Sequence, residues 1–196
     1  FYLLYADKKQ FSIFNPPAGR AGFQFSNKNV LDEWILARFN QLVGEVTAAM
    51  ENYELDKATR PLGDFVDDLS TWYLRRSRER IKTGCEESRA ALETLRFVLL
   101  ELSKVMAPFT PFFAEHLYKQ VGGNPKATDA LGLKESVHLE KWPAFVPQDG
   151  TSAWQAQIIS EMIEVRRIVS LALEARAKAN IKVRQPLGSL KLKMKS

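Results

Sequence analysis

The sequence is poor in the residues that bind metal ions or cross-link chains. Among 196 residues it has one cysteine, Cys85, and two histidines, His116 and His138. A single cysteine excludes an intrachain disulfide and a cysteine-based zinc site, and neither histidine has a Cys, Asp or His at ligand spacing. A lone free thiol is typical of a reducing compartment. We therefore expect no metal or cofactor in this chain and a cytoplasmic location.

Long hydrophobic runs and nucleotide-binding loops are also missing. No stretch reaches the ~20 apolar residues that span a bilayer, so we expect no membrane partner. The first five residues, FYLLY, lack the length and basic start of a signal peptide. No Gly-rich loop follows a predicted strand, which argues against a nucleotide site. Since the chain does not begin with Met, we interpret it as a segment of a longer protein.

Apolar residues make up 45% of the chain, enough for one hydrophobic core. Most of them recur in steps of three and four, which is the spacing of an amphipathic helix. Residues 122–150 instead hold four of the ten glycines and three of the nine prolines, and we interpret them as a long surface connection. The helical stripes cover residues 31–49, 55–72, 91–105 and 158–172, and a shorter helix is predicted from 111 to 122.

These patterns predict an all-α fold, a helical bundle with a small β or irregular C-terminal addition. We expect an irregular lead-in at residues 1–28, the bundle at 29–180, and a basic extended segment at 181–196 that enters a following small domain. Leucine and methionine alternate with lysine from residue 190 onward, as in a β-strand with one solvent-exposed face. Pro61 either kinks the second helix or marks its true first turn.

Positive charge is concentrated in two places. The net charge of the chain is +5, yet residues 72–82 carry +4 and residues 164–196 carry +7, so the remainder is acidic. Concentrated positive charge favours a polyanionic partner, since guanidinium groups bind phosphate bidentately. The alternatives are basic side chains that solvate helix ends and a protein-interaction module whose basic ends meet an acidic partner.

The most informative stretch is residues 68–80, where aromatic and basic side chains alternate. At 100° per residue, Arg76 and Arg80 continue the apolar face that carries Leu69 and Trp72. Trp72 and Tyr73 offer rings on which an unpaired base could stack, although Trp72 also suits the core. The basic residues of an adjoining stripe are Arg75, Arg78 and Lys82.

Candidate catalytic groups are few. Asp67 and Asp68 are adjacent carboxylates, and a free-standing enzyme would combine them with His116, but nothing in the pattern brings the three together. We favour a simpler interpretation, in which the two aspartates form ion pairs with Arg75 or Arg76 or keep the helix soluble. Sequence reasoning from the residues alone therefore assigns no catalytic residue to this chain.

Five motifs in order resemble the anticodon-binding domain of class I aminoacyl-tRNA synthetases. The arginine-rich part of the second motif and the last motif look most like the isoleucyl family. The valyl and leucyl families are alternatives with the same fold. The motifs are LDEWILAR at 31–38, DFVDDLSTWYLRRSR at 64–78, APFTPFFAE at 107–115, ESVHL at 135–139 with WP at 142–143, and KVRQPL at 182–187.

The resemblance implies that the parent protein is an enzyme that joins isoleucine to its tRNA and uses ATP and Mg²⁺. It also implies upstream catalytic and editing domains in the same polypeptide, with residues 1–28 leading in from the catalytic region. This segment would be non-catalytic and would bind the anticodon stem of the tRNA. The predicted tRNA contacts are Trp72, Tyr73, Arg75, Arg76, Arg78, Arg80, Arg166, Arg167, Lys182, Arg184 and Gln185.

Overall fold

The computed structural model describes residues 29–83, 86–122, 133–144, 152–189 and 191. Within these ranges the chain forms helices and turns and no strand, which confirms the all-α prediction. The predicted lead-in at 1–28 and all of the predicted strand except Lys191 lie outside them. The elements are α2 (Val30–Glu51), α3 (Leu55–Asp67), the π-helix η2 (Asp68–Leu74), α4 (Arg75–Lys82), α5 (Glu86–Met106), α6 (Pro111–Gly122), the 3-10 turn η3 (Val137–Leu139) and α8 (Ser152–Lys178).

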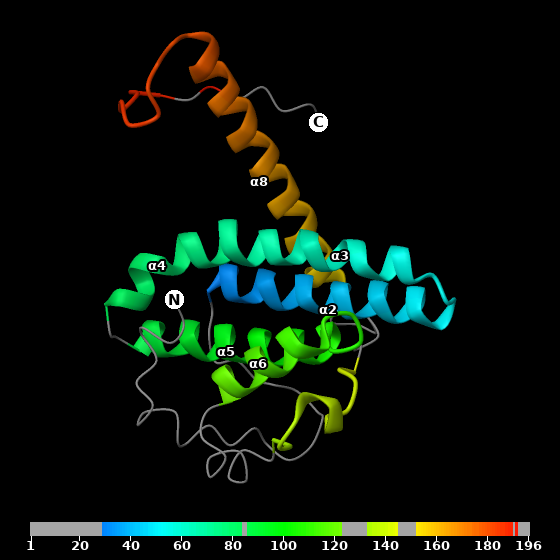
Figure 1. The fold of residues 1–196 in the computed structure, drawn as a ribbon. Coiled ribbons are helices and arrows are strands. Elements are labelled where there is room, and N and C mark those ends of the chain that lie inside the picture. The colour runs from blue at the N-terminus through cyan, green and yellow to red at the C-terminus, as the bar shows by residue number, and fades with distance from the viewer. Residues whose placement is uncertain (1–28, 84–85, 123–132, 145–151, 190, 192–196) are drawn as a thin grey trace.

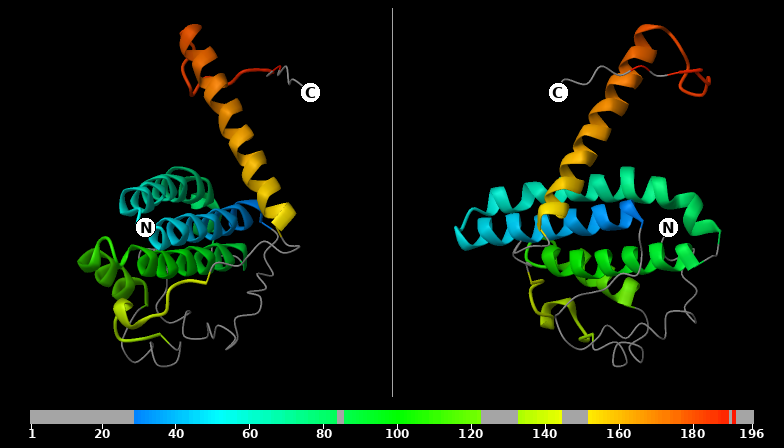
Figure 2. Two further views of the ribbon diagram at one scale, coloured as in Figure 1. Left: turned by 90° about the vertical axis from the view of Figure 1, so that its right-hand side faces the viewer. Right: turned by 180° about the vertical axis from the view of Figure 1, so that it is seen from behind.

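Helix α2 is the centre of the bundle. The continuous run from α3 to α4 lies along one side of α2, and α5 with α6 lies along the other (Figure 1). Helix α8 begins against α2 and then rises away from the bundle, as Figures 1 and 2 show from three directions. The bundle therefore has a compact body and one projecting helix.

Local signals set both ends of α2. The Asn29 side chain accepts a hydrogen bond from the Leu31 backbone N–H at 3.0 Å and caps the first turn. At the other end Asn52 is the C-cap, three residues after the end of the predicted apolar stripe at residue 49. Tyr53 follows with a φ of 58°, and the Glu54 N–H reaches back to the Ala49 carbonyl at 2.9 Å. This Schellman-type turn reverses the chain into α3.

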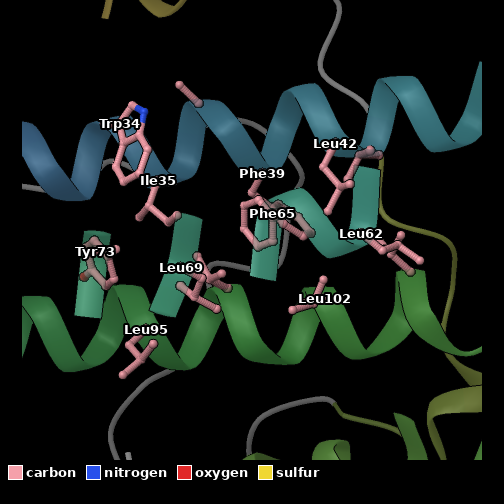
Figure 3. Close-up of a cluster of buried hydrophobic side chains, with 14 of the residues drawn as sticks. Trp34, Ile35, Phe39, Leu42, Leu62, Phe65, Leu69, Tyr73, Leu95 and Leu102 are labelled. Atoms are coloured by element: carbon pink, nitrogen blue, oxygen red, sulfur yellow. The ribbon is translucent and has the colours of Figure 1, made fainter. Parts of the chain in front are cut away.

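The core fills the space between α2, the α3–η2 run and α5 (Figure 3). Phe39 of α2 and Phe65 of α3 meet edge to face, with ring centroids 5.7 Å apart, a geometry that aromatic pairs favour. Both rings are buried, and burial of such a side chain contributes about 1.5–3 kcal/mol. Other fully buried core residues are Trp34, Ile35, Leu42, Leu95 and Val98.

The second predicted helix contains Pro61 within α3, so this proline does not mark the first turn. The important difference from the prediction lies further along the helix. Seven residues later the run becomes π-helical, and a π-helix has more residues per turn than an α-helix. The buried face therefore passes in steps of four from Leu69 to Tyr73, Ser77 and Ile81, and the predicted continuation from Leu69 through Trp72 to Arg76 is wrong.

Residues 133–144 also differ from the prediction, since they pack on the bundle instead of crossing its surface. Val137 is 3% exposed and lies against α6. The Glu115 carboxylate of α6 accepts hydrogen bonds from the Ser136 hydroxyl and the Val137 N–H, both at 2.9 Å. The Tyr118 hydroxyl donates to Glu140 Oε1 at 2.5 Å. Glycine and proline content predicted a loop correctly but could not reveal these tertiary contacts.

Candidate nucleic-acid interface

Helix α4 presents three arginines to solvent. Arg75, Arg76 and Arg78 are exposed, and none of them forms an ion pair with another residue of the described ranges. Their guanidinium groups are therefore available to bind anions. The fourth cation at this end, Lys82, already pairs with Glu79 at 2.9 Å.

Arg80 is used differently, because its side chain is only 11% exposed and faces α2. It donates to both carboxylate oxygens of Asp32, at 2.8 and 2.6 Å, a bidentate charge-assisted pair. Burial alone would lower the pKa of Arg80, but the hydrogen bonds and charge of Asp32 outweigh it and raise the pKa. A tRNA contact by Arg80 stays a prediction, and in this structure it would require breaking a buried ion pair.

Tyr73 belongs to the same buried cluster. It is 0% exposed, and its hydroxyl donates to Asp32 Oδ1 at 2.7 Å. Burial first, and then the neighbouring Asp32 carboxylate, raise the pKa of Tyr73 well above its ordinary value. The ring predicted to stack on a base therefore lies inside the bundle in this structure.

Trp72 is half-buried and lies between basic groups of two helices. The guanidinium carbon of Arg76 is 5.3 Å from the Trp72 ring centroid, and that of Arg166 is 5.1 Å away. Both distances fit a cation–π interaction. Trp72 thus brings a cation of α8 beside Arg76 of α4.

Arg166 is attached to the bundle mainly through Asp68. This carboxylate is 5% exposed, and it accepts from Arg38 Nε at 3.0 Å and from Arg166 Nη1. The exposed carboxylate of Asp67 lies 3.8 Å from Nη2 of Arg166. The adjacent aspartates therefore do form ion pairs, but with Arg38 and Arg166 instead of the expected Arg75 or Arg76.

The second basic region extends from Arg167 to the chain beyond α8. Arg167 is exposed and pairs with Glu164 at 2.6 Å, an exchangeable surface contact. Lys182, Arg184 and Gln185 are exposed after the end of α8, and the described part of the chain offers no ion pair to the two cations. Figures 1 and 2 show this segment at the far end of α8, away from α4.

A turn fixes the start of that segment. Asn180 has a φ of 53°, and the Ile181 N–H donates to the Arg176 carbonyl at 2.9 Å, again the Schellman pattern. The Arg176 side chain then donates to the carbonyls of Lys182 and Gln185, at 2.9 and 3.0 Å. Arg176 therefore organises the turn that displays Lys182 and Arg184.

The remaining candidates do not gather into a site. His116 and His138 are exposed, and Cys85 lies outside the described residues. Among the residues placed by the structure, no three His, Cys, Asp or Glu side chains form a group that could hold a metal ion. None of the helices described is long and apolar enough to cross a membrane. The structure thus brings together one group of predicted residues, namely Arg76, Trp72 and Arg166, while Arg75 and Arg78 are exposed on the same helix as Arg76.

Comparison with known proteins shows the family of this chain. The family described as "Anticodon-binding domain of tRNA ligase" matches residues 32–192. The chain is similar to isoleucine–tRNA ligases, with 39% identity to that of Clostridium novyi over the whole chain, 36% to that of Deinococcus radiodurans over the whole chain, and 39% to that of Streptomyces avermitilis over 83% of the chain.

The chain spans only 18%, 16% and 14% of the length of these three curated relatives, respectively. The matches confirm the resemblance that the five motifs indicated, and they support it over an interaction module of another family. They also agree with the isoleucyl type that the arginine-rich motif favoured. This chain belongs to the family of anticodon-binding domains of tRNA ligases.

Proposed function

We propose that this chain binds the anticodon arm of an isoleucine-accepting tRNA and orients it for an isoleucine–tRNA ligase. The observation that carries the proposal is the set of exposed arginines on α4, none of them ion-paired among the described residues. One of them, Arg76, lies over the half-buried ring of Trp72. Phosphate contacts by such side chains supply affinity and fix the register of the RNA. Arg166 adds a cation at the same place, next to Trp72.

The rest of the aminoacylation reaction belongs, in this proposal, to other parts of a longer cytoplasmic protein. Isoleucine, ATP and Mg²⁺ would bind in a catalytic domain, and an editing domain would lie in the same polypeptide. This chain would contribute binding and orientation, not bond formation. Lys182, Arg184 and Gln185, at the far end of α8, would form a second contact with the same tRNA.

A salt titration of tRNA binding tests the proposal. The variant is Arg75→Gln/Arg76→Gln/Arg78→Gln, and its binding to an isoleucine tRNA transcript is measured by filter retention. Each phosphate contact contributes about 0.7 to 0.9 to the slope of log K against log salt, so three lost contacts should lower the slope by about 2. The affinity at about 0.1 M salt should fall at least tenfold.

The matched control removes three positive charges elsewhere. Lys57, Arg60 and Lys119 are exposed and each pairs with an acid three or four residues earlier in the chain. Changing these three to Gln should leave the slope within about 0.5 of the original, because they lie off the α4 surface. Equal losses in both triple variants would contradict the proposal, since binding would then follow net charge alone. A preference for isoleucine over valine and leucine tRNA transcripts tests the assigned amino acid.

A further inference from the structure

We infer that Asp68 is a positioning residue that locks α8 to the bundle and so sets the geometry between the two basic regions. The inference rests on the proposed tRNA-binding function. Asp68 is the first residue of the π-helical segment, and its side chain is 7% exposed, while the side chain of neighbouring Asp67 is 61% exposed. One buried carboxylate thereby receives Arg38 from α2 and Arg166 from α8.

Arg166 is the outermost attachment of α8 to the bundle in the described chain. Nearer the start of α8, Ile158 is buried, Met162 packs on the core, and Asn40 of α2 donates to Gln155 at 3.4 Å. Beyond Arg166, the hydrogen bonds and ion pairs found for α8 stay within the helix and the turn that follows it. Leu171 and Leu173 are 48% and 45% exposed.

A long part of α8 extends beyond this attachment without further contacts of that kind among the described residues. Twelve residues separate Arg166 from the end of α8 at Lys178, which is about 18 Å of helix. A tilt of about 10° at the attachment would move the helix end by about 3 Å, roughly the length of a hydrogen bond. The positions of Lys182 and Arg184 relative to α4 therefore depend on the Asp68–Arg166 contact.

Loss of the Asp68 charge gives opposite results under two mechanisms. If only net charge matters, Asp68→Asn makes the chain more positive and should tighten tRNA binding. If Asp68 positions α8, the variant loosens the helix and weakens binding despite the added positive charge. Asp67→Asn is the matched control, since it makes the same charge change on the neighbouring residue, which is exposed and lies at the longer distance of 3.8 Å from Arg166.

The experiment measures α8 orientation and tRNA affinity separately. In a Cys85→Ser background, spin labels are placed at Glu51→Cys and Ala175→Cys, two exposed positions on α2 and α8, and pulsed electron paramagnetic resonance gives the distance distribution without RNA. We expect Asp68→Asn to broaden the distribution and to raise the tRNA dissociation constant about fivefold or more. Asp67→Asn should keep the original distribution and bind within about twofold of the parent chain.

A second matched pair covers the case in which Asp68→Asn does not fold, which circular dichroism would reveal. Arg166→Gln and Arg167→Gln each remove one positive charge from adjacent positions of α8. Arg166→Gln should broaden the distribution and weaken binding more than Arg167→Gln, which is expected to lose only a single charge contact. Unchanged distributions in Asp68→Asn and Arg166→Gln, or equal tRNA affinities within each matched pair, would overturn the inference. Failure of the parent chain to bind tRNA would instead overturn the proposed function.

Discussion

Arg76 and Arg80 lie four residues apart in one basic run, yet their replacement should have opposite consequences. In Arg80→Gln, Asp32 loses two hydrogen bonds from a guanidinium group although its own side chain is only 1% exposed. Removing one partner of a buried ion pair costs about 3–5 kcal/mol. For a chain of this size each kcal/mol shifts the melting temperature by about 2–4 °C, so Arg80→Gln should melt about 10 °C lower.

Arg76→Gln should behave as a surface variant. Arg76 is exposed and its guanidinium group lies over the Trp72 ring, an interaction of about 0.5–1 kcal/mol at such a site. The melting temperature should fall by no more than about 4 °C, while tRNA affinity falls. Thermal unfolding by circular dichroism, with tRNA binding measured below both transitions, separates the two effects. An Arg80→Gln chain that melts like the parent would refute the assignment of Arg80 to the core.

Three further predictions concern two residues that hold the 133–144 segment on the bundle and the turn that follows α8. Burial alone would raise the pKa of Glu115, but hydrogen bonds from Lys119, Val137 and Ser136 lower this pKa. The stability that the Glu115 carboxylate contributes should therefore be present above about pH 4.3, and it should be lost as the pH falls through the lowered pKa. Urea unfolding should show this acid loss in the parent chain and less of it in Glu115→Gln. Burial and then Glu140 raise the pKa of Tyr118, so the stability that the Tyr118 hydroxyl contributes is present below about pH 10 and is lost as the pH rises through the raised pKa. In urea unfolding at alkaline pH, Tyr118→Phe should lose less stability with rising pH than the parent chain. An unchanged pH profile would count against this assignment. Arg176→Gln should release the turn at 182–185, and faster amide hydrogen exchange there, with α2 unaffected, would confirm it.

The sequence predicted the helices well because their signals are local. Pro111 opens α6 where the sequence predicted the shorter helix to begin, since caps and prolines act within one or two turns. The π-helical segment escaped prediction because a wheel of 100° per residue assumes a regular α-helix throughout. Its effect was to move Tyr73 into the core and to leave Trp72 at the edge of the core.

The partners of charged residues were harder to predict than the helices. Asp32 lies 48 positions from Arg80, and Asp68 lies 98 positions from Arg166, so no short-range pattern links them. Adjacent charges in the sequence suggested Arg75 or Arg76 as partners of the aspartates. The fold instead supplied arginines from α2 and α8, because the buried carboxylate faces those helices and a buried charge requires a partner within reach.

The arginines within residues 72–82 differ in burial, since Arg75, Arg76 and Arg78 are exposed and Arg80 is ion-paired inside the bundle. This difference changes how the basic run should be tested. Charge reversal at Arg76 together with Arg80 would remove one exposed cation and one buried ion pair, so a loss of binding could reflect unfolding alone. Arg75, Arg76 and Arg78 can be changed without breaking any ion pair among the described residues, and they report on RNA contact directly. If the proposed function holds, the run combines a tRNA-binding surface with a structural anchor, and the burial of each side chain separates the two roles.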